Sequence, residues 1–402
     1  MAFQSFSGKA HLKIDICNNY GMDKEDWDVR IDWFDKNQDN LMELVKTAET
    51  PALFYAGVQA WYAVQRGEPI GYPISLDATA SGMQLLACLT GDREAAKLCN
   101  VIDTGKREDA YTGIYNAMVE AIGGVSTITR NDTKTAIMTA LYGSEAEPKK
   151  VFGTGQLLST FEATMGVMVP AVWSMTKAFV QLWKPTVKIN SWVLPDNAHI
   201  HVKVVDKVKE TVNFLDRSYE TIREVNQPKK TSKSLGPNCI HSIDGLVVRE
   251  MGRRCDYDPA LISYVKQVLV SPSGNQAEED NVSLGMVKTL WTHYEKSGFL
   301  SARILDYIHT DTVHVVDVDV IWELLLSLPE KPFKTISTHD CWRCLPHYGN
   351  DLRLQYNNLL MLIAKSEMLS FILTQITGQV VTYKKLDPDL WKDIMESNYS
   401  LS

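Results

Sequence analysis

The sequence ISLDATASGMQ at residues 74–84 decides how the rest of the chain is interpreted. Its first residues have the composition of a short strand that places Asp77 at its end. Small residues follow, and we expect Ser81 to cap a short apolar helix that stops at Gly91. This setting exposes a carboxylate and lets the backbone carbonyl of Ala78 approach a metal ion. A single aspartate at a strand end is more often an ordinary turn or capping residue.

A second aspartate in a similar setting lies far along the chain. Asp340 follows the strand-like run Phe333–Thr338 and is preceded by His339. Nucleotidyl transfer requires carboxylates that can share divalent metal ions and cations that bind a triphosphate. These two aspartates meet the first requirement.

A basic helix predicted between the two aspartates provides such cations. Arg130, Lys134, Met138 and Tyr142 recur at steps of four, so they form one stripe along a helix face. An arginine fork and a lysine point charge suit a triphosphate, and a tyrosine offers a hydroxyl and a flat ring to a sugar and base. The spacing alone favours an ordinary solvated basic helix, but the two aspartates change that interpretation.

Hydrophobic period and stop signals predict the remaining elements. Expected helices are Lys106–Ile122 ending at Gly123-Gly124, a helix from Ser126 or Thr127 to Tyr142, Leu157–Trp183 interrupted by Pro170, and 351–376; an expected hairpin has strands Val187–Leu194 and His199–Val205; residues 229–237 are expected to form a basic loop and 271–280 a linker.

The bulk composition is that of a folded globular protein. The 402 residues are 45% hydrophobic and 22% charged, with a net charge of −8, which argues against simple coating of nucleic acid but allows a local basic channel. The start has no signal sequence and no run of about 18 apolar residues occurs, so we expect a cytoplasmic protein without membrane contact. The seven cysteines are scattered and expected to be reduced.

Taken in order, these motifs resemble motifs A, B and C of the bacteriophage and mitochondrial single-subunit DNA-dependent RNA polymerases. The resemblance extends along the chain to the histidine segment that contacts the incoming nucleotide, a lysine helix upstream of motif A, and the final foot. The matching residues are Asp77-x3-Ser81-Gly82-x-Gln84, Arg130-x3-Lys134-x3-Met138-Thr139-x2-Tyr142-Gly143-Ser144, Pro237-Asn238-x2-His241-Ser242-x-Asp244-Gly245, His339-Asp340-Cys341, the helix ending in Lys46, and 390–397.

The resemblance implies a fold and a division into domains. The expected fold is mixed α+β, a right-hand polymerase with palm and fingers, mostly helical, with a small antiparallel palm sheet and no thumb. The first part of the palm would be 1–104, the fingers 105–240, and the second part of the palm 241–402. An insertion of about 251–330 has no clear family counterpart.

The resemblance also implies the chemistry of template-directed RNA synthesis. Two magnesium ions would be held by Asp77 and Asp340 with help from the Ala78 carbonyl. Three cations, Arg130, Lys134 and Lys46, would contact the nucleotide phosphates, and Lys134 could protonate the leaving group. Two further residues, Tyr142 and His241, would sense the ribose 2′-hydroxyl, which distinguishes RNA from DNA precursors.

One departure from the family implies a partner. The family carries an Asp-x-x-Gly-Arg motif upstream of motif A, and none occurs in this sequence. We therefore expect a second protein subunit that supplies the thumb and this motif, as in the large catalytic polypeptide of the two-subunit RNA polymerase of N-four-like phages. The other expected partners are a DNA template, the RNA product and rNTPs, in the cytoplasm of an infected bacterium.

Two other functions remain open. A DNA polymerase of the same superfamily also uses arginine, lysine and tyrosine on a helix, but such enzymes favour a glutamate in motif A, where Gly82 stands here. A catalytically inactive nucleic-acid-binding subunit is the alternative of another class, and the intact aspartates argue against it.

Two groups of residues are candidate ligands for additional metal sites. Zinc ligands could be chosen from His339, Cys341, Cys344 and His347, but their spacing is compressed. A second group is His309, Asp311, His314, Asp317 and Asp319, where the alternation of valine and acidic residues favours a half-exposed strand.

Overall fold

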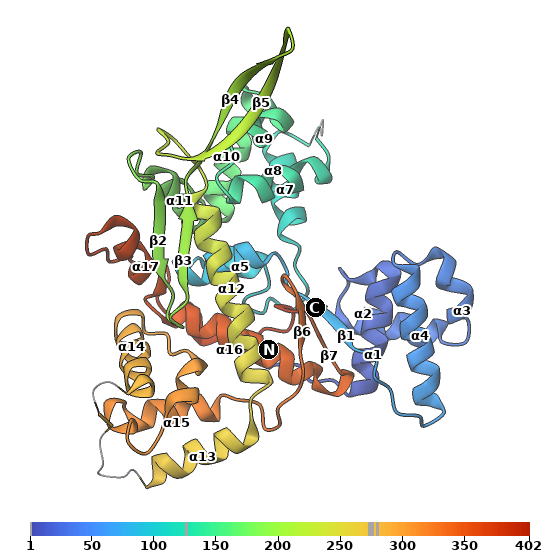
Figure 1. Cartoon of the computed structure of the whole chain (residues 1–402). Helices are drawn as coiled ribbons and strands as arrows, with labels where there is room; N and C mark the ends of the chain where they lie inside the picture. The colour runs from blue at the N-terminus through green and yellow to red at the C-terminus, as the bar shows by residue number, and fades with distance from the viewer. Residues whose placement is uncertain (1, 125–127, 272–276, 279–280) are drawn as a thin grey trace.

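The computed structural model describes residues 2–124, 128–271, 277–278 and 281–402. Most of this part is helical, and its strands form small antiparallel sheets, as the sequence predicts (Figure 1). Among the described residues no single helix has the length and apolar composition to cross a bilayer, although two sharply bent helix pairs together do.

A three-stranded sheet joins segments from opposite ends of the sequence. Its strand order is β1-β7-β6, and both neighbouring pairs are antiparallel. The strands are β1 (Ile74–Asp77), β6 (Ile336–Thr338) and β7 (Cys341–Cys344). The predicted strands before Asp77 and before His339 are therefore both confirmed.

Helices surround this sheet in two groups. The N-terminal group lies to the right of β1 in Figure 1, and the second group lies on the other side of the sheet, where its helices contact one another. The N-terminal elements are α1 (Gly8–Cys17), η1 (Asn18–Met22), α2 (Trp27–Asn37), α3 (Leu41–Leu44), η2 (Val45–Thr47) and α4 (Pro51–Gln65); the second group is α5 (Ser81–Thr90), α12 (Leu235–Cys255) and α16 (Gly349–Lys365), followed by α17 (Met368–Thr377).

A third helical group carries the predicted basic helix and two hairpins. The chain bends by 116° between α10 and α11, at the predicted break before Pro170. The elements are α6 (Arg93–Leu98), α7 (Ala110–Ala121), α8 (Arg130–Leu141), α9 (Ala146–Phe152), α10 (Gln156–Met168), α11 (Pro170–Gln181), β2 (Ile189–Val193), β3 (His199–Lys203), β4 (Val205–Phe214) and β5 (Arg217–Asn226). The β2–β3 hairpin is confirmed, whereas the exposed β4–β5 hairpin, which projects from the molecule in Figure 1, is not predicted by the sequence reasoning.

Local capping explains where several predicted boundaries differ. Ser81 is not a cap: the chain turns at Ala80, which has a φ of 61°, and Ser81 is the first helical residue. The helix α8 is capped by Thr129, whose side chain accepts a hydrogen bond from the Asp132 N–H. The predicted start at Ser126 or Thr127 lies outside the described residues.

A separate small hydrophobic core lies within the predicted insertion. Its side chains include Ile262, Leu290 and Ile321, and they do not join the main core. The elements are α13 (Pro259–Val270), α14 (Val282–Ser297), η3 (Ala302–Tyr307), η4 (Val313–Val315) and α15 (Val318–Leu326). The predicted half-exposed strand over the valine and acidic residues is wrong, because the side chain of Asp317 accepts from the Asp319 N–H and starts α15. The predicted linker at 271–280 lies mostly outside the described residues.

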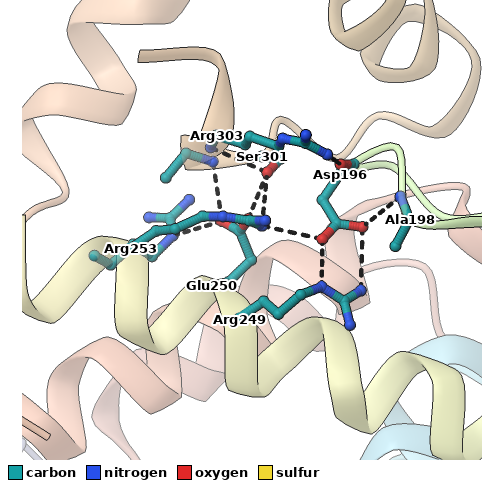
Figure 2. A network of polar contacts seen from close by, with 9 residues as sticks. Asp196, Ala198, Arg249, Glu250, Arg253, Ser301 and Arg303 are labelled. Atoms are coloured by element: carbon teal, nitrogen blue, oxygen red, sulfur yellow. Dashed lines mark hydrogen bonds and ion pairs between the residues drawn. The ribbon is translucent and has the colours of Figure 1, made fainter. Parts of the chain in front are cut away.

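A buried ionic network fastens this small core to α12 (Figure 2). The carboxylate of Asp196, from the β2–β3 turn, accepts hydrogen bonds from Arg249 (2.6 Å) and Arg253 (3.0 Å) on α12. Glu250 accepts from Arg253 (2.8 Å) and from the backbone N–H of Ala302 (2.9 Å). Because both carboxylates are fully buried, each depends on these partners, and the network holds three elements in one arrangement.

The C-terminal segment returns to the three-stranded sheet. After η5 (Pro346–Tyr348) and α16, the last helical turn is η6 (Leu390–Glu396), packed on α16. Leu401 then forms a bridge with Ala78, and the Ser402 N–H donates to the Asp77 carbonyl at 2.9 Å. The end of the described chain thus lies directly beside the strand end that the sequence singled out.

Candidate active site

The structure brings Asp77 and Asp340 together at one end of the sheet. Asp77 is the last residue of β1 and pairs with Cys341, the first residue of β7. Asp340 lies in the two-residue turn between β6 and β7, and its carbonyl accepts a hydrogen bond from the Ala78 N–H at 3.1 Å. His339 takes a φ of 56°, which allows this tight turn.

The electrostatics of this pair suit a divalent cation. The pKa of Asp77 is raised to about 6, first by burial of the carboxyl group and second by the charge of Asp340. Two carboxylates that repel one another at an open strand end offer the hard oxygen ligands that magnesium prefers. Asp77 and Asp340 therefore fit the expected metal ions, and Ala78, the residue after Asp77, is hydrogen-bonded to the Asp340 carbonyl.

The predicted stripe occupies the open face of α8. The opposite face is buried and contains Thr133, Ala136 and Ile137. Lys134 and Met138 are exposed, and at the C-terminal end Tyr142 and Met138 line one cavity with Asp340. The helix thus runs toward the two aspartates with its stripe facing solvent.

Residues at the start of α7 restrain the two stripe cations. Asp109 caps α7 and forms an ion pair with Arg130, whose Nε also donates to the Thr112 hydroxyl at 2.6 Å. The Lys134 ammonium lies 5.4 Å from the centre of the Tyr111 ring. The guanidinium keeps N–H groups beyond those used for Asp109 and Thr112, so it retains capacity for a phosphate.

Tyr142, His241 and Gly82 meet in a cavity beside Asp340. The rings of Tyr142 and His241 lie 5.2 Å apart, and both line the cavity that also contains Gly82 and Asp340. A Cβ atom at Gly82 would lie 2.6 Å from the Tyr142 hydroxyl oxygen, so only glycine fits this arrangement. Burial, with the charges of Asp244 and Asp340, raises the pKa of Tyr142.

Asp244 is a site residue that the sequence reasoning missed. It follows His241 by one turn of α12 and lines the same cavity as Tyr142 and Asp340. Burial and the charge of Asp340 raise the pKa of its carboxyl group. The sequence did offer one indication of its role, because Asp244 belongs to the same motif as His241.

A second cavity has Asp77, and not Asp340, in its lining. Its lining combines acidic, amide and hydroxyl side chains with one arginine, Arg107. The lining residues are Asp15, Asn18, Asn19, Asp23, Glu49, Thr50, Ser75, Asp77, Ala78, Arg107 and Ser402. The sequence reasoning also missed Arg107, because KRED at residues 106–109 is typical of the charged first turn of a helix.

The predicted contact Lys46 lies apart from both cavities. It is exposed in η2 and does not belong to the lining of either cavity around the aspartates, although Glu49, three residues later, does. Within the described ranges no group of three or more histidine, cysteine or acidic side chains converges as a metal site, at the compressed cysteine motif or in the small core. All seven cysteines are unpaired thiols.

Comparison with known proteins places these features in a family. The sequence model described as DNA-dependent RNA polymerase matches residues 5–211. A probable DNA-directed RNA polymerase of Gelasinospora sp. (strain G114) is 25% identical over 288 residues, which cover 55% of this chain and 35% of that protein. The DNA-directed RNA polymerase of Pseudomonas phage phiKMV is 22% identical over 298 residues, covering 58% and 36%.

A mitochondrial DNA-directed RNA polymerase is also similar. The protein of Neurospora crassa is 27% identical over 164 residues, which cover 34% of this chain and 12% of that protein. The chain spans at most 36% of the length of these three relatives.

Proposed function

The chain belongs to the DNA-dependent RNA polymerase family, and from that premise we propose that it carries the catalytic centre of template-directed RNA synthesis. The observation that carries this proposal is the meeting of Asp77 and Asp340 beside the cavity of Tyr142 and His241. In this proposal residues 1–104 and 241–402 form the palm, and residues 105–240 form the fingers.

The metal ligands in this proposal are Asp77, Asp340 and the carbonyl of Ala78. These groups would hold two magnesium ions, which would supply activation of the RNA 3′-hydroxyl and stabilisation of the charge on the phosphates. The carboxylates position this chemistry at the sheet end, where the Ala78–Asp340 hydrogen bond holds the two strands together.

The protein's cations neutralise the triphosphate. Arg130 is held by Asp109 and Thr112, so its remaining N–H groups are oriented before the nucleotide arrives. Lys134 adds a mobile point charge on the same open face and can donate a proton to the departing pyrophosphate. Lys46 remains a proposed phosphate contact, which would require movement of the exposed segment that carries it.

The sugar is recognised on the other side of the site. The Tyr142 hydroxyl and the His241 ring line the same cavity as Asp340, where the ribose 2′-hydroxyl can hydrogen-bond to them. The close packing of Gly82 on Tyr142 leaves no room for a glutamate at that position, which supports ribonucleotides over the DNA polymerase alternative.

We further propose a second subunit that provides the thumb and the Asp-x-x-Gly-Arg motif, as in two-subunit phage polymerases. The support is that this motif, which the family carries upstream of motif A, does not occur in the 402 residues. In this arrangement the DNA template and RNA product are held between the two polypeptides, in the cytoplasm of an infected bacterium.

A magnesium-dependent incorporation assay tests the proposal. The full chain, with any polypeptide that co-purifies from its native host, would be given a DNA template, an RNA primer, and rNTPs or dNTPs. We expect extension with rNTPs that requires magnesium. Binding of the template without any extension would instead favour an inactive nucleic-acid-binding subunit, and equal use of dNTPs would favour a DNA polymerase.

A further inference from the structure

The cavity on the Asp77 side contains one cation among several carboxylates. Asp15, Asp23, Glu49 and Asp77 all line it, and Arg107 is its only arginine or lysine among the described residues. The contacts of Arg107 decide whether its guanidinium is fully used by these carboxylates or is available to a ligand.

Arg107 is anchored at two points that leave the end of its side chain free. Its backbone N–H donates to the Asp26 carboxylate at 2.6 Å, and its Nε donates to the Ser402 hydroxyl at 3.1 Å. In the part of the chain that the structure describes, its two Nη groups donate no hydrogen bond to protein. The charges of Asp23, Asp109 and Asp77 act on the guanidinium without any of them pairing with it. Free donors on a half-buried, fixed guanidinium are suited to an anionic ligand.

Arg107 belongs to the same short segment that organises the other two phosphate cations. Two residues later Asp109 pairs with Arg130, and two residues after that the Tyr111 ring lies under Lys134. The segment therefore extends from the Asp77 cavity to the stripe on α8. Residues 107–111 thus carry one cation and contact the other two.

The direction of a bound nucleotide follows from the two cavities. The sugar-recognising side chains Tyr142 and His241 lie with Asp340 in the first cavity. A triphosphate that extends away from this sugar site and passes the metal ligands reaches the cavity of Asp77, Ala78 and Arg107. The distal phosphates would then meet Arg107, the one cation in the described lining of that cavity.

We propose that Arg107 is a third phosphate-binding residue, which contacts the β- and γ-phosphates of the incoming nucleotide and then the pyrophosphate. This inference rests on the proposed function. In the reaction the RNA 3′-hydroxyl loses its proton to water, its oxygen forms a bond to the α-phosphorus, and the bond from that phosphorus to the β-phosphate oxygen breaks. The electron pair stays on the pyrophosphate, whose added charge Arg107 stabilises through its N–H groups without giving up a proton.

The test compares Arg107→Gln and Arg107→Lys with a matched control, Lys106→Gln. Lys106 is the adjacent cation, but its side chain is 64% exposed and faces Glu108 at 3.5 Å. The wild-type and variant chains, each with its co-purified polypeptides, would be assayed for rNTP incorporation and for the reverse reaction with inorganic pyrophosphate. We expect Arg107→Gln to raise KM for both rNTP and pyrophosphate by roughly ten- to a hundredfold, the effect of losing a charge-assisted hydrogen bond. Arg107→Lys should recover part of the loss, and Lys106→Gln should match the wild type.

Three results would overturn the inference, and each is separate from failure of the proposed function. Unchanged KM values in Arg107→Gln, in an enzyme that polymerises, would remove Arg107 from the phosphate site. An equal loss in Lys106→Gln would indicate a general charge effect. An unchanged KM for pyrophosphate in Arg107→Gln, beside a raised KM for rNTP, would remove its contact with the β- and γ-phosphates. Absence of polymerisation by the wild type would instead contradict the proposed function itself.

Discussion

The backbone N–H of Ala78 donates a hydrogen bond to the carbonyl of Asp340 at 3.1 Å, although the two residues lie near opposite ends of the sequence. This bond continues the β1–β7 ladder past Asp77. The two catalytic candidates therefore cannot separate without breaking the sheet, and their spacing is a property of the backbone. A site built on strands holds its geometry better than one built on mobile loops.

Tyr142→Phe should keep polymerisation but weaken the choice between rNTPs and dNTPs. The substitution removes the hydroxyl that lines the cavity with His241 and Asp340 while keeping the ring. Loss of one neutral hydrogen bond predicts a fall in rNTP preference of about tenfold. The measurement is kcat/KM for matched rNTP and dNTP pairs, and an unchanged ratio would contradict the sugar-sensing role.

Gly82→Ala should impair the same site by displacing Tyr142. The new methyl carbon would lie 2.6 Å from the tyrosine hydroxyl oxygen, too close for either group to stay in place. We expect at least a tenfold loss in kcat/KM for rNTPs with little loss of thermal stability. Gly71→Ala is the matched control, because a Cβ there meets nothing within 4 Å, and an equal loss in that variant would refute the steric explanation.

Asp92→Ala should destabilise the fold more than loss of an ordinary helix cap. The buried Asp92 carboxylate accepts from the Ala95 N–H at the start of α6 and from the Ala171 and Val172 N–H groups at the start of α11. Losing two caps predicts a decrease of about 2–4 kcal/mol in the free energy of unfolding. Asp258→Ala, which removes the cap of α13 alone, should cost about 1 kcal/mol, measured by denaturant unfolding. Equal losses would show that the shared cap has no special weight.

Asp15 should make the protein less stable as the pH rises. Burial raises the pKa of this carboxyl to about 6 from an unfolded value of 3.8, so the folded state binds the proton more tightly. Its unfavourable contribution grows between pH 4 and pH 6 and reaches about 3 kcal/mol above that range. Asp15→Asn removes this ionisation, so its stability relative to the wild type should increase over the same interval. A difference between the two proteins that stays constant from pH 4 to pH 7 would contradict the assignment.

Local signals in the sequence predict the parts of the fold that depend on neighbouring residues. The strand before Asp77, the end of α5 at Gly91 and the break at Pro170 follow from residues within a few positions, and all three are confirmed. The stripe on α8 also depends only on nearby residues, at steps of four, and it is confirmed. The β4–β5 hairpin was missed because its turn contains Leu215 and Asp216 at positive φ, without the glycine that usually marks such a turn.

Contacts between distant segments explain what the sequence could not predict. The position of Arg107 depends on Ser402, which lies 295 residues away. The restraint of Arg130 by Asp109 depends on how α7 packs on α8. A pattern of neighbouring residues cannot reveal contacts between segments so far apart in the sequence. The second cavity could therefore be found only from the folded structure.

Iron-directed cleavage tests the central claim, that Asp77 and Asp340 share the same metal ions, most directly. Fe²⁺ would replace magnesium in the full chain, and hydroxyl radicals would then cut the backbone close to the bound ion. We predict cuts near residue 77 and near residue 340 in the same sample, both suppressed by excess magnesium and both lost in Asp77→Asn and in Asp340→Asn. Cuts at only one of these segments, or cuts that survive either substitution, would contradict a shared metal site.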